Sequence, residues 1–225
     1  MYQLYLGNKN YSSWSLRGFL AMKLSGAPFT ERMISLSGTG EPNPGNRTFS
    51  PTGRVPCLHD GETVVWDSLA IAEYLAERHR GMWPNEAPAR AWARCVAAEM
   101  HSGFSTLRNE MTMCIRERVD VRPWSEPLEA DIARVVHIWD ESRRRFGSGG
   151  AFLCGRFSIA DCFYAPVAFR FQTYEVKVEG VARAYLDALL GHPLLREWEK
   201  AALAETTIVD ADEPRNLYRD KIASP

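Results

Sequence analysis

The sequence changes character near residue 80, because strand-like and helix-like stretches alternate before that point and only helix-like stretches follow it. Strand patterns alternate apolar and polar side chains, whereas helix patterns repeat apolar side chains every three or four residues. The dipeptide Asp60-Gly61 lies between two short strand patterns, which is typical of a β-hairpin. The first part is expected to contain strands at 2–7 and 29–36 and on both sides of the hairpin turn within 55–67, helices at 15–24 and 68–78, and a loop at 37–50.

The second part, from about residue 86 onward, contains no persistent strand pattern. Helices are predicted at 88–118, 127–146, 158–172, 180–190 and 193–204. Ser158 and Asp161 have the spacing of a capping box, which fixes a helix start. The stretch HRGMWPNEAP between the two parts contains glycine and proline, as linkers between domains do. We therefore expect an α/β domain over residues 1–80 and an all-α domain over residues 86–225.

Composition narrows the kind of partner that this protein has. The formal net charge is -1, so the chain lacks the basic surplus that binds nucleic acid or an anionic membrane. No apolar run approaches the roughly 20 residues that cross a bilayer, and the N-terminus does not read as a signal peptide. The dispersed cysteines and histidines suggest neither disulfides nor a metal. A cytoplasmic protein with a small-molecule or protein partner is predicted.

Three serines surround one tryptophan in NYSSWSLRGFL, residues 10–20, just before the first predicted helix. A serine at a helix start can accept hydrogen bonds from the free N–H groups of the first turn. The same hydroxyl could instead hold a chemical group, because the first turn of a helix also attracts negative charge. Ser12 and Ser13 are the candidates for both roles.

Three further stretches, together with this order of elements, resemble the glutathione transferase superfamily. SPTGRVPCL at 50–58 is similar to its loop leading to a cis-proline, WDSLAIAEYLAE at 66–77 to its acidic residue and serine at a helix start, and GRFSIADCFYAP at 155–166 to its capping motif. The resemblance implies a thioredoxin-like glutathione-binding domain at 1–80 and an all-helical domain at 86–225 that contributes the pocket for an electrophile. It also implies a homodimer.

The segment SSWSLR at 12–17 resembles the SSCSWR element of the zeta class, also called maleylacetoacetate isomerase, except that Trp14 replaces its cysteine. The resemblance assigns the catalytic role to Ser12, with Ser13 as the close competitor and otherwise the helix cap. A free thiol has a pKa near 8.5, so only a few per cent is ionised at neutral pH. A hydroxyl that donates to the sulfur stabilises the thiolate by about 1.5–3 kcal/mol, or about one to two pKa units.

Other residues in these motifs are candidates for binding the rest of glutathione. Asp67 and Ser68 begin a predicted helix, where a carboxylate and free N–H groups match the ammonium and carboxylate of the γ-glutamyl end. The alternative is that Asp67 only caps the helix. The resemblance implies a cis Val55-Pro56 bond, with Val55 pairing to the cysteinyl backbone like an added strand. Arg54 is a candidate partner for the glycyl carboxylate.

The predicted helix around 99–116 carries Met, Phe and His side chains, and in the family this helix lines the electrophile pocket. Methionine adapts to irregular ligands, although an apolar stripe at helical spacing is as often only core. Together with two residues beside the paired serines, the candidates for substrate binding are Tyr11, Trp14, His101, Phe104 and Met111.

The predicted function is a glutathione transferase in which a serine activates glutathione, as co-substrate and without a metal, for attack on a small electrophile. The first alternative is a glutathione-dependent cis-trans isomerase of the zeta type, which the replacement by Trp14 disfavours. The second is a binding module without catalysis, which the presence of Ser12, Val55-Pro56 and Asp67-Ser68 disfavours. A cysteine-type redox enzyme is disfavoured because no cysteine lies near the start of the first helix.

Overall fold

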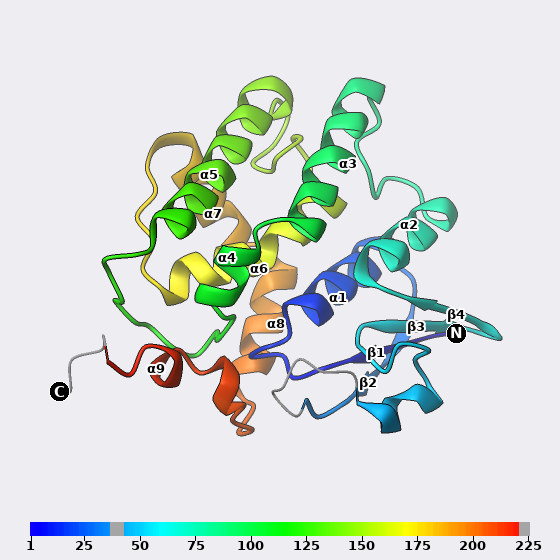
Figure 1. Cartoon of the computed structure of the whole chain (residues 1–225). Coiled ribbons are helices and arrows are strands. Elements are labelled where there is room, and N and C mark those ends of the chain that lie inside the picture. The colour runs from blue at the N-terminus through cyan, green and yellow to red at the C-terminus, as the bar shows by residue number, and fades with distance from the viewer. Residues whose placement is uncertain (37–42, 221–225) are drawn as a thin grey trace.

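A mixed four-stranded sheet forms the first part of the fold (Figure 1). The computed structural model describes residues 1–36 and 43–220. The strands are β1 (Tyr2–Leu6), β2 (Phe29–Met33), β3 (Cys57–Asp60) and β4 (Thr63–Trp66), in the order β2-β1-β3-β4. β1 is parallel to β2 and antiparallel to β3, and β3 turns into β4 through Gly61, whose φ of 60° is left-handed. The predicted hairpin is confirmed.

Two helices connect this sheet to the helical part. α1 (Ser13–Ser25) ends at Gly26, a left-handed C-cap. α2 (Ser68–Arg78) packs beside α1, and α1 also packs against α6 (Ile159–Thr173) of the second part. Gly18 allows a close approach, since a Cβ there would lie 2.9 Å from the Pro56 side chain. The start of α1 therefore lies where the two parts of the chain meet (Figure 1).

The helical part departs from the predicted pattern between residues 103 and 125. Its other helices are α3 (Ala87–Ser102), α4 (Ser105–Glu110), α5 (Glu126–Phe146), α7 (Gly180–Leu190) and α8 (Pro193–Leu203). The prediction of one helix at 88–118 is wrong, because the chain breaks at Gly103 and Phe104. A Cβ atom at Gly103 would lie 2.8 Å from the Glu99 carbonyl oxygen. Phe104 has a left-handed backbone, with φ of 57°. The Leu107 N–H then donates to the Asp131 carboxylate at 2.9 Å, which supports a separate short helix.

α6 is the buried centre of the helical part. The capping box predicted at its start is confirmed, because the Ser158 N–H donates to Asp161 Oδ2 at 2.8 Å and both residues are buried. Asp161 Oδ1 also accepts hydrogen bonds from the Leu153 N–H at 3.0 Å and the Tyr185 hydroxyl at 3.1 Å. Burial raises the pKa of the Asp161 carboxyl to about 6. These bonds fix the position of α6, which carries Arg170.

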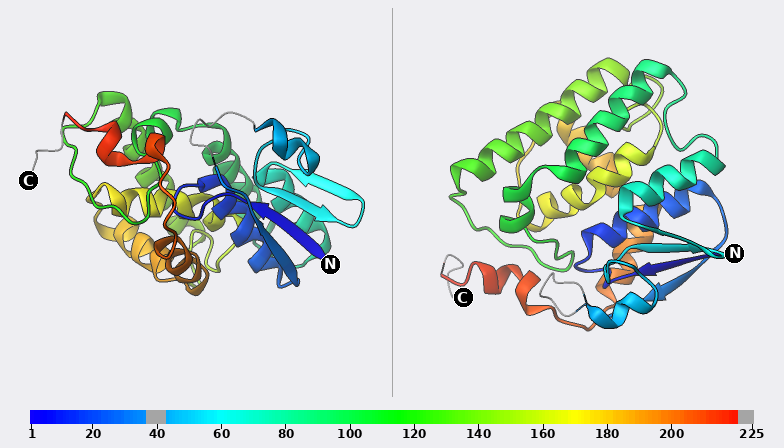
Figure 2. Two further views of the ribbon diagram at one scale, coloured as in Figure 1. Left: turned by 90° about the horizontal axis from the view of Figure 1, so that it is seen from below. Right: turned by 45° about the vertical axis from the view of Figure 1, so that its right-hand side comes forward.

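The chain after α8 passes the loop before α1 and then runs along the helical part, away from the sheet (Figure 2). We call residues 205–218 the C-terminal segment; it contains the short helices η2 (Asp210–Asp212) and α9 (Pro214–Leu217). The Glu205 carboxylate accepts hydrogen bonds from the N–H groups of Lys9, at 2.7 Å, and Asn10, at 3.0 Å. The C-terminal segment is thereby tied to the loop that precedes α1.

Three further expectations concern the loop, the cysteines and the surface. Of the loop expected at 37–50, residues 37–42 lie outside the described residues, and Pro44–Thr48 form a short 3-10 helix, η1. All five cysteines are free thiols.

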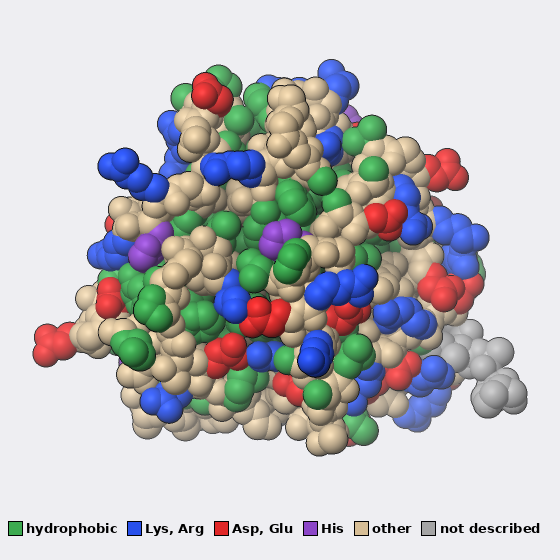
Figure 3. All heavy atoms as spheres, turned by 180° about the vertical axis from the view of Figure 1, so that it is seen from behind, with side chains coloured by type: hydrophobic (Ala, Val, Ile, Leu, Met, Phe, Trp, Pro, Cys, Tyr) green, Lys and Arg blue, Asp and Glu red, His purple; other side chains and the backbone are tan. Residues whose placement is uncertain are grey.

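Across the described residues, no helix combines the length and the apolar character that crossing a membrane requires. On the face shown in Figure 3, basic and acidic side chains are interspersed.

Candidate functional site

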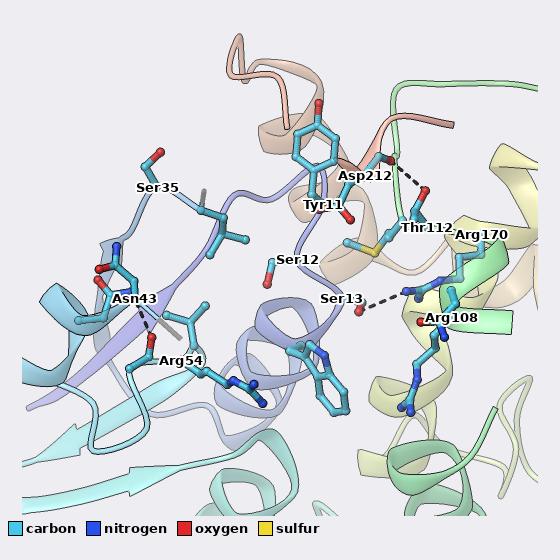
Figure 4. A pocket seen from close by; sticks show the side chains of 17 residues that line it. Tyr11, Ser12, Ser13, Ser35, Asn43, Arg54, Arg108, Thr112, Arg170 and Asp212 are labelled. Atoms are coloured by element: carbon cyan, nitrogen blue, oxygen red, sulfur yellow. Dashed lines mark hydrogen bonds between the residues drawn. The ribbon is translucent and has the colours of Figure 1, made fainter. Parts of the chain in front are cut away.

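A cavity of about 420 Å³ opens where the start of α1 meets the helical part (Figure 4). One wall, which we call the sheet wall, carries mostly hydroxyl, amide and backbone groups; the other, the helical wall, comes from α4, α6 and the segments beside them. The sheet wall consists of Tyr11, Ser12, Ser13, Trp14, Ser35, Leu36, Asn43, Asn46, Gly53, Arg54 and Val55. The helical wall consists of Arg108, Asn109, Thr112, Met113, Arg170 and Asp212.

Ser12 is the N-cap of α1. Its Oγ accepts the Ser15 N–H at 3.2 Å and donates to Ser15 Oγ at 2.8 Å. The expectation that Ser13 is the cap is wrong, because Ser12 has the extended backbone of a cap, with φ of -81° and ψ of 92°. The hydroxyl proton of Ser12 is therefore directed to Ser15 rather than into the cavity.

Ser13 is the first residue of α1 and faces the helical wall (Figure 4). Its Oγ accepts a hydrogen bond from Arg170 Nη2 at 3.4 Å, which leaves the hydroxyl proton of Ser13 available to an acceptor in the cavity. The free N–H groups and the dipole of the first turn favour negative charge at this point. A donor proton, a helix start and an arginine thus meet at Ser13.

Arg170 and Arg108 place positive charge on the helical wall without a carboxylate in ion-pair contact among the described residues. Arg170 is 4% exposed, and its Nε donates to the Met111 carbonyl at 2.6 Å. Arg108 Nη1 donates to the His101 carbonyl at 3.0 Å. Burial lowers the pKa of Arg170 to about 10, and the like charge of Arg108 adds to the effect. Neutral partners leave both charges available to an anion.

Trp14 lines the cavity and also contacts cations. The Cζ atoms of Arg17 and Arg108 lie 4.6 Å and 5.4 Å from the centroid of its ring, within the range of cation–π attraction. Arg17 is fully buried, and its guanidinium nitrogens have no hydrogen-bond partner in the described part of the chain. Burial lowers the pKa of Arg17 to about 9, and the charges of Arg170 and Arg108 contribute. Trp14 therefore shields two positive charges beside the paired serines.

Tyr11 connects the sheet wall to the C-terminal segment. Its hydroxyl donates a short hydrogen bond to Glu213 and accepts one from Arg116 Nη2 at 3.3 Å. Burial, followed by the bond to Glu213, raises the pKa of Tyr11 to about 12. The Tyr11 hydroxyl is therefore engaged by protein groups.

The loop before β3 brings its candidate residues to the same cavity. The predicted cis bond between Val55 and Pro56 is confirmed. Val55 and Arg54 line the sheet wall, and Pro56 is buried next to them. Ser50 Oγ donates to the Arg54 carbonyl at 2.8 Å, which holds this loop in place.

The structure does not bring Asp67 and Ser68 into this cavity. Asp67 caps α2, with its Oδ1 2.8 Å from the Leu69 nitrogen, and lies in a separate open hollow of about 620 Å³. His101 lines the same hollow, and its Nε2 lies 3.4 Å from Asp67 Oδ2. Burial lowers the pKa of His101. Among the described residues, Ser68 Oγ and His101 Nδ1 have no hydrogen-bond partner, although both are buried.

Three of the five residues predicted to bind substrate do not line this cavity: His101, which lies at the hollow beside α2, and Phe104 and Met111. Met111 has no exposed surface, and Phe104 is 8% exposed where the chain leaves α3. The reason is the break after α3, which removes the helical spacing on which both predictions depended. Thr112 and Met113 face the cavity instead.

Sequence analysis missed the charged residues of the helical wall. Arg170 had a signal, because it is a lone charge in the apolar stretch YAPVAFRF and arginine is rarely buried without a partner. Asp212 had none, since its position depends on the packing of the C-terminal segment. No group of three or more His, Cys, Asp or Glu side chains in residues 1–36 and 43–220 could hold a metal ion.

Known proteins share this architecture. Residues 11–78 match the family model of the glutathione S-transferase N-terminal domain, and residues 125–201 match that of its C-terminal domain. Maleylacetoacetate isomerase maiA of Aspergillus fumigatus is 29% identical over 191 residues, which are 77% of this chain and 79% of that protein. Dichloromethane dehalogenase of Methylorubrum extorquens is 42% identical over only 55 residues, 24% of this chain and 19% of that protein. The crystal structure of a glutathione transferase homolog from Burkholderia, with bound glutathione, has a TM-score of 0.66 at 22% identity and covers 91% of this chain and 98% of that one.

Proposed function

Because this chain belongs to the glutathione S-transferase superfamily, we propose that it is a transferase that activates glutathione as a thiolate for attack on a small electrophile. The observation that carries the proposal is the meeting of Ser13, the first turn of α1 and Arg170 at one point of the cavity. Each of the three stabilises a negative charge there.

In this proposal Ser13, rather than Ser12, donates the hydrogen bond to the thiolate. Its hydroxyl oxygen is held by Arg170, so its proton is free to reach the sulfur. Such a bond stabilises the thiolate by about 1.5–3 kcal/mol and lowers the thiol pKa by about one to two units. Ser12 fixes the first turn of α1 through its cap.

The remainder of glutathione binds along the sheet wall and at α2. The Val55 backbone pairs with the cysteinyl residue, and Arg54 binds the glycyl carboxylate. The γ-glutamyl group binds at the start of α2, beside Asp67. Two buried polar atoms support this placement of the γ-glutamyl group. Ser68 Oγ and His101 Nδ1 have no hydrogen-bond partner among the described residues.

The helical wall favours an electrophile that carries an acidic group. Arg108 and Arg170 both line the cavity, and among the described residues their hydrogen bonds go to carbonyl and hydroxyl oxygens. A guanidinium binds a carboxylate through two parallel hydrogen bonds, which no neutral group of the same shape can match. We therefore propose an acidic electrophile as the preferred substrate class.

A second candidate function is glutathione-dependent cis-trans isomerisation of an acidic substrate. The same two arginines favour it, as does the 29% identity to maleylacetoacetate isomerase maiA. Trp14, in place of the cysteine of SSCSWR, is the feature that differs. The two reactions differ in stoichiometry, because a transferase consumes glutathione and an isomerase returns it.

The experiment is an assay of the purified protein with glutathione against maleylacetoacetate and a matched pair, 4-chloro-3-nitrobenzoate and its neutral amide. The transferase proposal expects loss of free thiol with the benzoate in preference to the amide. Conversion of maleylacetoacetate without loss of thiol would establish the isomerase instead. Glutathione binding by calorimetry with no turnover of any substrate would indicate a binding module, and absence of glutathione binding would overturn the proposal.

We further propose a cytoplasmic homodimer. Trp66 is 43% exposed and, with Val64, Val65 and Leu69, surrounds the hollow beside α2, and an exposed apolar patch of this kind is typical of a protein contact. The five free thiols are typical of a reducing compartment. Analytical ultracentrifugation at micromolar concentration should give twice the mass of one chain, and a monomer would remove the dimer from the proposal.

A further inference from the structure

Asp212 is the acidic side chain of the cavity. Within the described part of the chain, it alone of the residues that line the cavity is acidic, and it lies on the helical wall with Arg108 and Arg170 (Figure 4). It reaches this position from the C-terminal segment, outside both matched family domains. Its carboxylate accepts no hydrogen bond from the residues that the structure describes, whereas its backbone carbonyl does.

The C-terminal segment is held in place without this carboxylate. Thr112 Oγ1 donates to the Asp212 carbonyl at 2.9 Å, and the next residue, Glu213, accepts the hydrogen bond from Tyr11. Earlier in the segment, Arg116 Nη2 donates to the Thr207 carbonyl at 2.8 Å. An amide in place of the carboxylate would leave all of these bonds intact, so the charge of Asp212 can be removed without releasing the segment.

We propose that Asp212 is a specificity-determining residue, whose charge competes with the anionic group of an electrophile for Arg170 and Arg108. In a partly buried cavity the field of one carboxylate reaches nearby cations with little screening. The competition weakens the binding of anions and leaves the binding of neutral compounds unchanged. This inference rests on the proposed function for the role of the cavity, although the competition itself applies to any anion that enters.

The pH dependence gives the inference a second signature. Burial raises the pKa of Asp212 to about 6, against the opposing effect of Arg170. Above that pH the carboxylate is charged and competes; as the pH falls through about 6 it takes up a proton, the competition ends, and anions bind more tightly. The other ionisable groups in this region come from several elements. They are Arg108 of α4, Cys114 and Arg116 of the next segment, Arg170 of α6, Tyr174 at the C-cap of α6, Tyr11 before α1, Arg54 before β3, and Glu213.

Four of these neighbours keep one charge state between pH 5.5 and 7.5. Burial raises the pKa values of Tyr11, Tyr174 and Cys114, which keeps all three neutral. Burial leaves the pKa of Arg170 at about 10, so its guanidinium keeps its proton. A change in anion binding that disappears with the Asp212 carboxylate is therefore assigned to Asp212.

The test is calorimetry in which benzenesulfonate or benzenesulfonamide is titrated into the 225-residue chain saturated with S-methylglutathione. The sulfonate keeps its charge over the whole pH range, and the sulfonamide is its neutral counterpart. Asp212→Asn should bind benzenesulfonate about tenfold more tightly than the native protein at pH 7.5, the ratio that corresponds to one pKa unit. Affinity for benzenesulfonate should rise between pH 7.5 and 5.5 in the native protein and stay level in the variant. Asp210→Asn, a change at an exposed neighbour outside the cavity, should match the native protein.

Three results would overturn the inference. The first is equal benzenesulfonate affinity in the native protein and Asp212→Asn at pH 7.5. The second is tighter binding of both probes, which would indicate a changed shape rather than a removed charge. The third is no benzenesulfonate binding to Asp212→Asn. The S-methylglutathione titration tests the proposed function separately: if that ligand does not bind, the proposed function fails, while benzenesulfonate titration of the protein alone still tests the competition.

Discussion

The two walls of the cavity are built in different ways. The sheet wall presents hydroxyl and backbone groups from short motifs, such as Ser13 at the start of α1 and Val55 before β3. The helical wall presents charges, and Arg108, Arg170 and Asp212 come from three segments that are far apart in the sequence. Local backbone geometry therefore fixes one wall, whereas long-range packing fixes the other. We expect changes in the sheet wall to act on glutathione and changes in the helical wall to act on the electrophile.

Removal of the Ser13 hydroxyl should have the largest effect. Ser13→Ala should raise the thiol pKa of bound glutathione by about one to two units, because the thiolate loses a charge-assisted hydrogen bond. Where thiolate formation limits the rate, turnover near neutral pH should fall by roughly 10- to 100-fold. The thiol pKa is measured from the ultraviolet absorbance of the bound thiolate against pH. The same shift in Ser12→Ala, with none in Ser13→Ala, would return the catalytic role to Ser12.

Removal of the Asp67 charge should have the next largest effect, on glutathione affinity. Asp67→Asn keeps an acceptor for the Leu69 N–H and so keeps the cap of α2. The γ-glutamyl ammonium loses its ionic partner, and calorimetry should show affinity falling by about tenfold, as for a lost charge-assisted bond. Glu73→Gln removes a charge from the same hollow without touching the cap, and serves as the control. Equal affinities in native protein and Asp67→Asn would place the γ-glutamyl group elsewhere.

The sheet wall could be predicted from the sequence better than the helical wall could. The cis bond of Val55 and Pro56 was predicted only from the resemblance of SPTGRVPCL to the family's loop. Ser12 and Ser13 were found because helix caps depend on neighbours in sequence. The capping box at Ser158 was found for the same reason. The hairpin at Asp60-Gly61 belongs to the same class of local features.

Features that depend on distant packing were missed. Helical periodicity extended through Gly103, although a tertiary hydrogen bond from Leu107 to Asp131 supports a separate helix after it. That error placed Met111 in the cavity, whereas it is core. Asp212 lies in the cavity because the segment that carries it folds back over Thr112, and no local pattern encodes that path.

A change in the helical wall should separate electrophiles by charge. Arg108→Met should raise KM for 4-chloro-3-nitrobenzoate by about fivefold, less than a fully buried ion pair would give, because Arg108 is partly exposed and Arg170 remains. KM for the neutral amide and the affinity for glutathione should stay unchanged, and Arg108→Lys should retain most of the preference. Steady-state kinetics measure all three. Equal increases for the benzoate and the amide would mean that Arg108 acts by packing on Trp14 and not by its charge.

The smallest effect is expected for the Ser12 cap, and it concerns stability. Ser12→Ala removes the acceptor of the Ser15 N–H, so the free energy of unfolding should fall by about 1 kcal/mol. In a protein of this size that lowers Tm by roughly 2–4 °C. Ser13→Ala should melt within about 1 °C of the native protein, because Ser13 caps nothing and a change of under about 0.5 kcal/mol is ordinary for such a site. Thermal melts and thiol titrations of both variants together distinguish the role of the Ser12 hydroxyl from that of the Ser13 hydroxyl. If Ser12→Ala lost the thiolate and kept its Tm, the hydroxyl that caps α1 here would turn to the sulfur when glutathione binds, and the sheet wall would not be fixed by local backbone geometry alone.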